Sequence, residues 1–132
     1  MAISIELIRK AIEAIAAIDG VLMDPASLAE DAAFLAYAFP EESEFQAACA
    51  NTCRALRQIC NGSVTASNLK YEFEDWQSYH YQHRVRQGLQ ADCRIKFRQT
   101  PQGIEVKGFG HRRIPRDFYL RMAGIGRSGS EN

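Results

Sequence analysis

The chain has 132 residues, of which 46% are apolar, and its 16 acidic and 16 basic side chains give a formal net charge of zero. No run of about 18 apolar residues is present, and the start lacks the basic region and apolar block of a secretory signal. We therefore expect a single cytoplasmic domain with no membrane partner.

The two halves of the chain carry opposite charge. Residues 1–75 contain 12 acidic and 5 basic side chains, whereas residues 76–132 contain 4 acidic and 11 basic side chains together with all three histidines. This division indicates a polyanion-binding surface in the second half and an acidic first half that shields it or faces a basic partner. The alternative is that the halves attract one another within the fold.

Three helices are predicted in the first half, over residues 4–18, 25–39 and 41–60. In the first, isoleucines recur at helical spacing, at Ile5, Ile8, Ile12 and Ile15. Asp24 before Pro25 is typical of a helix start, and Asn61-Gly62 of a helix end.

The cysteines of the third predicted helix fall on one stripe of its surface. Cys49, Cys53 and Cys60 share this stripe with Leu56. Reduced, buried cysteines explain the pattern, and zinc binding with a histidine is the alternative. Because no CxxC pair is present, no metal site is predicted.

The second half predicts strands. One or two strands are expected between Leu69 and Arg86, after a loop at residues 64–68. Residues 94–98 and 104–107 alternate apolar and charged side chains, and Thr100-Pro101-Gln102-Gly103 joins them as a hairpin turn. One face then carries Ile95, Phe97, Ile104 and Val106, and the opposite face carries charged residues in water.

The predicted fold class is α+β, with N-terminal helices packed against a small antiparallel sheet and a short C-terminal helix. It is one domain made of an acidic helical part (1–62), a basic sheet part with the terminal helix (69–122) and a frayed tail (123–132).

Basic and aromatic residues alternate in the sheet part. Guanidinium groups hold phosphates and rings stack on unpaired bases, so this composition favours binding of single-stranded RNA. The candidate RNA-binding residues are Arg84, Arg86, Lys96, Arg98 and Arg113. The same residues would also suit a solvated face that pairs with the acidic helices.

About 40 residues of the second half resemble the RelE/ParE superfamily of bacterial toxins. The resemblance lies in the order HRVR, DCRIKF, a PQG turn, IEVKGFGHRR and a closing RDFY, within residues 83–119. The family begins with a strand before two helices, whereas about 60 mainly helical residues come first here.

The resemblance implies a metal-independent endoribonuclease that needs no cofactor and cuts mRNA on the ribosome, by attack of a ribose 2′-hydroxyl on the adjacent phosphate. Arg94 and Arg112 match the phosphate-stabilising arginines, Tyr119 matches the closing tyrosine, and His111 or His83 adds acid-base capacity. RNA or the ribosome is then a partner, and the acidic half would meet an antitoxin or another target protein. A branch of the same superfamily acts instead on DNA gyrase.

The second hypothesis is a non-catalytic interaction protein, such as an inhibitor, immunity or regulatory protein, with an acidic helical face and a basic sheet face. It predicts that Phe34, Tyr37 or Phe39 is exposed. A small-molecule enzyme has little support, because the chain lacks a glycine-rich phosphate loop, an HExxH motif and a nucleophile elbow.

Overall fold

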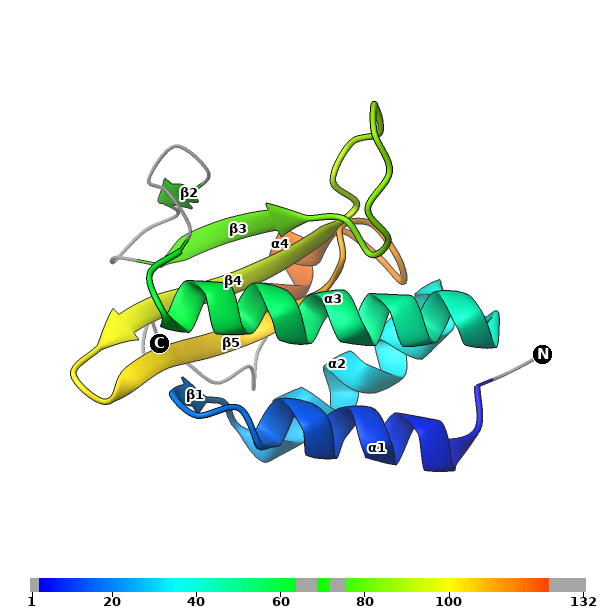
Figure 1. Cartoon of the computed structure of the whole chain (residues 1–132), viewed down its shortest axis with the longest axis horizontal. Helices are drawn as coiled ribbons and strands as arrows, with labels where there is room; N and C mark the ends of the chain where they lie inside the picture. The colour runs from blue at the N-terminus through cyan, green and yellow to red at the C-terminus, as the bar shows by residue number, and fades with distance from the viewer. Residues whose placement is uncertain (1–2, 64–68, 72–75, 124–132) are drawn as a thin grey trace.

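The computed structural model describes residues 3–63, 69–71 and 76–123. Its helices are α1 (Ile5–Ala16), α2 (Pro25–Ala38), α3 (Glu42–Cys60) and α4 (Phe118–Met122) (Figure 1). Its strands are β1 (Val21–Leu22), β2 (Leu69–Tyr71), β3 (Gln77–Tyr81), β4 (Cys93–Thr100) and β5 (Gly103–His111). The predicted α+β fold class is confirmed. The predicted loop at 64–68 and the tail from 124 onward lie outside the described residues.

Side-chain caps mark the starts of α1 and α2, and the predicted start at Asp24-Pro25 is confirmed. The Ser4 hydroxyl accepts the backbone N–H of Leu7 at the start of α1, and the Asp24 carboxylate accepts that of Ser27 at the start of α2. Each cap satisfies a backbone donor that lacks a partner inside the helix.

The five strands form one sheet in the order β1-β5-β4-β3-β2. β2 to β5 pair antiparallel with their neighbours, and the predicted hairpin joins β4 to β5. β1 was not predicted. It pairs parallel with β5, Val21 opposite Ile104 and Leu22 opposite Glu105, so the sheet is mixed rather than purely antiparallel.

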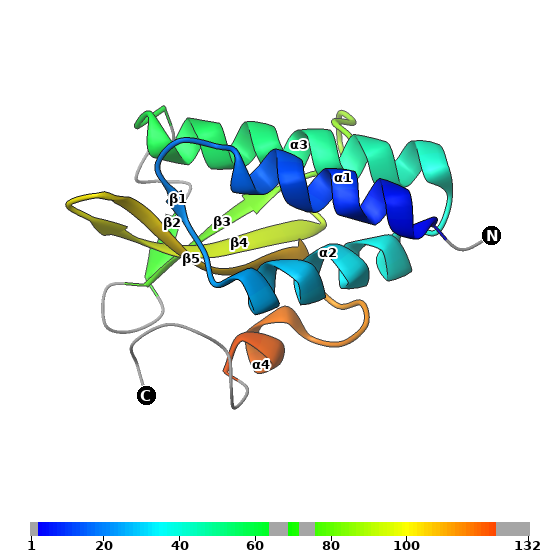
Figure 2. The same ribbon diagram turned by 90° about the horizontal axis from the view of Figure 1, so that it is seen from below.

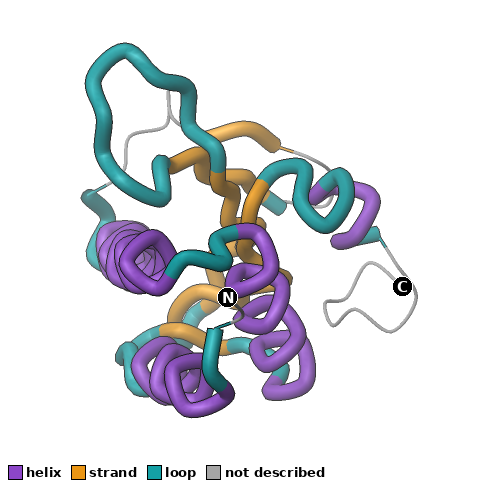
Figure 3. Tube along the Cα trace, turned by 90° about the vertical axis from the view of Figure 1, so that its right-hand side faces the viewer, coloured by secondary structure: helices purple, strands orange, loops and turns teal. Residues whose placement is uncertain are grey.

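The three long helices and the sheet share one hydrophobic core. Figures 2 and 3 show the long helices on one side of the sheet and α4 on the other. The core takes side chains from all three long helices. It also contains the four apolar sheet residues that were predicted to share a face, and all four are fully buried: Ile95, Phe97, Ile104 and Val106. The helical and sheet parts therefore stabilise one another through buried apolar surface.

The charged face of the sheet does not lie in water, and that prediction was wrong. Arg94 is 9% exposed, Lys96 5% and Lys107 1%. Part of the cause is α4, which approaches β5 so closely that a Cβ on Gly108 would overlap the Met122 sulfur. The buried Trp76 ring also lies against this face, 5.5 Å from the Lys107 ammonium.

The outer edge of β5 is closed by side chains beyond its short pairing with β1. Asp31 of α2 accepts the backbone N–H of Phe109 at 3.0 Å, and Arg121 of α4 donates to the Phe109 carbonyl at 2.9 Å. The Arg121 guanidinium also lies 3.7 Å from the buried Asp31 carboxylate. One acidic residue of the first half thus pairs with one basic residue of the second half inside the fold, as the charge-attraction alternative expects.

Candidate functional site

The face of the sheet beneath α4 brings together hydrogen-bonding side chains from β3, β4 and α4. Because side chains alternate along a strand, Ser78 and His80 point to this face while Tyr79 and Tyr81 point to α3. On β4, Arg94 lies directly opposite His80 in the antiparallel register. We call Ser78, His80, Arg94 and Tyr119 the α4-face cluster.

Tyr119 connects α4 to this cluster. Its hydroxyl is 2.8 Å from the Ser78 hydroxyl and 3.3 Å from His80 Nε2. The Asp117 carboxylate caps the helix by accepting the backbone N–H groups of Tyr119 and Leu120, which holds the tyrosine at the first turn of α4. A phenol and an imidazole in contact can pass a proton between them.

Arg94 supplies positive charge beside these groups. Its Nη1 donates to the carbonyls of Ala91 and Cys93 at 3.0 Å each, and its Nε has no hydrogen-bond partner among the described residues. The two carbonyl bonds hold the guanidinium close to the start of β4. Its remaining donors can offset negative charge that develops nearby.

The other two predicted catalytic residues, His111 and Arg112, lie at and just after the end of β5. Arg112 follows the end of β5. Its side chain donates to the Gln90 side chain, and its backbone N–H donates to the Asp92 backbone carbonyl. His111 points to the helical side of the sheet, with its ring centroid 5.7 Å from that of Phe39. Its Nδ1 accepts the backbone N–H groups of residues 113 and 114, and burial lowers its pKa. Arg94 and Tyr119 thus lie on the same face of the sheet, each next to His80, and His111 lies on the opposite face.

The predicted RNA-binding residues divide into engaged and exposed side chains. Lys96 is buried, Arg98 pairs with Glu105 and lies over Trp76, and Arg84 pairs with Glu44. Arg86 and Arg113 are exposed. Phosphate contacts require reachable cations, so these two retain the predicted role most directly.

His83, in the loop after β3, contacts α3 and the residue that follows α2. Its Nδ1 lies 2.6 Å from Asp92 and its Nε2 lies 2.6 Å from Glu44, while Phe39 stacks on its ring. Each ring nitrogen of His83 thus faces a carboxylate oxygen. The hydrogen bond from His83 lowers the pKa of Glu44. Burial raises the pKa of Asp92, but the hydrogen bonds from His83 have the larger combined effect, so the pKa of Asp92 is also lowered.

These shifts predict acid sensitivity. A carboxyl whose pKa is lower in the folded chain stabilises the fold above its unfolded pKa, about 4, and loses that contribution as the pH falls through the folded value. The free energy of unfolding should therefore drop as the pH falls below about 4, and less steeply in Glu44→Gln. Urea unfolding at a series of pH values measures this, with Glu42→Gln on the same helix as the control. Parallel curves for wild type and Glu44→Gln would contradict the prediction.

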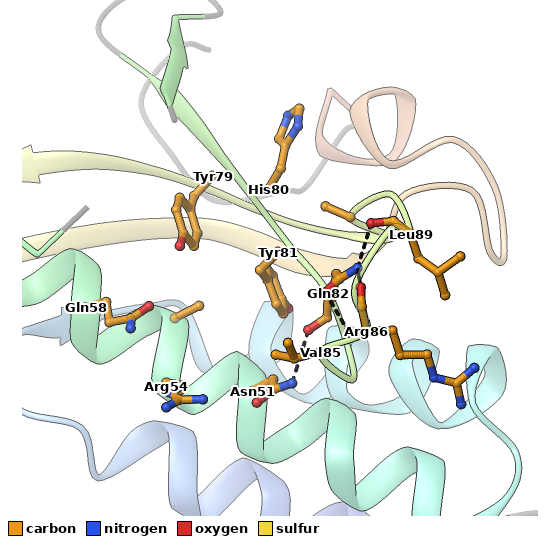
Figure 4. A pocket seen from close by; sticks show the side chains of 12 residues that line it. Asn51, Arg54, Gln58, Tyr79, His80, Tyr81, Gln82, Val85, Arg86 and Leu89 are labelled. Carbon is orange, nitrogen blue, oxygen red and sulfur yellow. Dashed lines mark hydrogen bonds between the residues drawn. The ribbon is translucent and has the colours of Figure 1, made fainter. Parts of the chain in front are cut away.

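An open cleft of about 420 Å³ lies between α3 and β3 (Figure 4). Its walls come from α3, from β3 and from the loop that follows: Asn51, Arg54, Ala55, Gln58, Tyr79, His80, Tyr81, Gln82, Val85, Arg86, Leu89 and Ala91. Figure 4 shows the Tyr79 and Tyr81 side chains on the α3 side of β3 and the His80 ring on the other side. The β3 strand thus separates this cleft from the α4-face cluster.

Ser78 and His80 were not among the site residues predicted from the sequence. The signal was present, because Tyr79 and Tyr81 alternate with them and two tyrosines on the core side force the other pair onto the charged face. The cysteines add no nucleophile here: all four are free, and burial raises the pKa of Cys49 to about 12. Within the described residues no group of histidine, cysteine and carboxylate side chains is placed to hold a metal ion.

Comparison with known proteins adds no family. No protein-family model, no curated protein and no solved structure matches this chain. Among the described helices none is long and apolar enough to cross a membrane. The function must be argued from the geometry and from the resemblance in the second half.

Proposed function

We propose that this protein acts on RNA at the α4 face, as a metal-independent endoribonuclease of the RelE/ParE type. The observation that carries the proposal is the contact of Tyr119 with His80, directly across from Arg94. His80 is thus a neighbour of both the strand arginine and the closing tyrosine, which come from separate motifs.

The order of elements supports the resemblance. β1 precedes α2 and α3, and the antiparallel strands follow, so a strand comes before two helices as in the family. Without β1 the first half had looked purely helical. α1 then stands as an additional helix in front of this arrangement.

The cluster offers the groups that the reaction needs. In RNA cleavage of this kind the 2′-oxygen forms a bond to phosphorus while the bond from phosphorus to the 5′-oxygen breaks. His80 would take the proton from the 2′-hydroxyl, and Tyr119 would give one to the departing 5′-oxygen. Arg94, helped by Arg112 at the end of β5, would offset the added charge on the phosphorane. The products are a 2′,3′-cyclic phosphate and a 5′-hydroxyl.

The experiment is mRNA cleavage in a cell-free bacterial translation mixture, with new RNA ends mapped by primer extension. Wild-type protein should create ends that carry a 5′-hydroxyl, and an Arg94→Ala, Arg112→Ala double variant should create none. Because Arg94 also holds two backbone carbonyls, circular dichroism must show that the variant is folded. Absence of new ends with the wild type, or equal cleavage by both proteins, would contradict the proposal.

The second candidate is an interaction protein, and exposed apolar side chains on the helical layer favour it. Tyr37 is 68% exposed and Ile5 83%, whereas Phe39 is buried and Phe34 half-buried against Arg121. Among the three aromatics expected to be exposed, only Tyr37 clearly is. A wild-type protein that leaves mRNA intact, but whose partner binding is lost in Tyr37→Ser, would favour this function.

A further inference from the structure

We propose that the cleft between α3 and β3 holds a nucleotide of single-stranded RNA next to the one cleaved at the α4 face. This inference rests on the proposed function and extends its substrate site across the edge of β3. Three observations carry it: the charge of the cleft walls, the accessible tyrosine ring, and the position of His80 between the two sites.

The walls of the cleft suit an anion. Arg54 on α3 and Arg86 on the loop are both exposed and stand on its opposite rims, and none of its twelve lining residues is acidic. The chain as a whole has as many acidic as basic residues, so a lining with two arginines and no acidic residue is more basic than the chain average. It favours the phosphate backbone of a nucleic acid.

The floor of the cleft suits a base. The Tyr79 and Tyr81 rings are nearly parallel, at 10° with centroids 6.4 Å apart. Tyr81 is buried and its hydroxyl bonds Thr52, so Tyr79, which is half-buried, is the ring that a base can reach. Stacking on one ring requires an unpaired base, and therefore a single strand.

The cleft wall is formed before any ligand arrives. Gln82 bonds the loop at three points, donating to the carbonyls of Arg86 and Leu89 and accepting the Arg86 backbone N–H. Asn51 of α3 donates to the carbonyls of Gln82 and His83 and ties the loop to the helix. A preorganised wall reduces the ordering cost of binding.

His80 connects the two sites. It lines the cleft, while its ring on the other side of β3 contacts Tyr119. The described pairing of β2 with β3 covers Gln77 to Tyr79. An RNA strand that passes His80 would reach both the α4 face and the cleft.

The test uses the full chain and a fluorescent single-stranded RNA of about ten nucleotides. Every ribose carries a 2′-O-methyl group, so the RNA cannot be cut, and binding is followed by fluorescence anisotropy across a salt series. An Arg54→Glu, Arg86→Glu double variant should weaken binding and reduce the salt slope by about 1.4, as expected for two lost phosphate contacts. Tyr79→Leu, which keeps apolar bulk, should weaken binding about 5- to 100-fold.

Arg57→Glu is the matched control. It makes the same charge change as the single variant Arg54→Glu, on the same helix. Arg57 is exposed and lines a different hollow with Cys60, so this change should leave the salt slope unchanged. Equal effects of Arg54→Glu and Arg57→Glu would overturn the inference, as would wild-type protein that binds no RNA. Displacement of the RNA by a polyglutamate peptide as readily as by unlabelled RNA would also overturn it.

The two proposals fail in different ways. If the wild type cleaves mRNA but the cleft variants bind RNA as it does, the cleft assignment is lost and the proposed function stands. If the wild type cleaves nothing but binds RNA through Arg54, Arg86 and Tyr79, the cleft assignment stands and the proposed cleavage is lost.

Discussion

Replacing Asp31 by alanine should lower the free energy of unfolding by about 3–5 kcal/mol. Asp31 is fully buried, accepts the Phe109 N–H and lies beside the Arg121 guanidinium. Its loss leaves the buried N–H of Phe109 without that acceptor and the buried Arg121 guanidinium without the Asp31 carboxylate. Urea denaturation of the two proteins measures the difference.

The control is Asp19→Ala, an exposed carboxylate of the same half, which should change stability by less than about 0.5 kcal/mol. An Asp31→Leu, Arg121→Leu double variant should lose less than the sum of the two single changes, because the second removes the charge that the first leaves buried. A cost for Asp31→Ala no greater than that for Asp19→Ala would mean that the closed edge of β5 does not depend on this residue.

Tyr119→Phe should reduce mRNA cleavage about 10²- to 10⁴-fold, because it removes a proton donor from the α4-face cluster. The ring that packs α4 remains. The lost hydrogen bonds to Ser78 and His80 should cost about 0.5–1.5 kcal/mol of stability, so the variant should stay folded. The initial rate of appearance of new RNA ends gives the comparison.

Two further variants separate chemistry from structure. Ser78→Ala removes the other hydroxyl partner of Tyr119 and should slow cleavage far less than Tyr119→Phe. His111→Gln changes the histidine on the helical side of the sheet and should leave the rate unchanged. Cleavage lost in His111→Gln but kept in Tyr119→Phe would move the site to the opposite face of the sheet.

Local signals in the sequence predicted most of the fold. Asp24 predicted a helix start because its side chain satisfies a backbone donor, which is a local interaction. The hairpin followed likewise from local turn chemistry and period-two alternation. β1 escaped prediction because two residues carry no period, and it exists only through its pairing with the distant β5.

The accessibility of the site could not be predicted in the same way. Alternation placed Arg94 and Lys96 on the charged face of the sheet, but α4, a five-residue helix, lies across part of that face. Arg121 is likewise buried by long-range contacts with Asp31 and Phe109. Charge counts describe composition, whereas burial depends on tertiary packing, and the basic surface is therefore smaller than the composition indicated.

The most direct test of RNA binding at the α4 face is amide chemical-shift mapping by NMR, with the 2′-O-methyl RNA titrated into labelled full-length protein. We expect the largest shifts at His80, Arg94, Gly110 and Tyr119, with little change along α1. Shifts confined to α1 and α2, or no shifts at RNA concentrations that saturate binding, would contradict the assignment of this face to RNA.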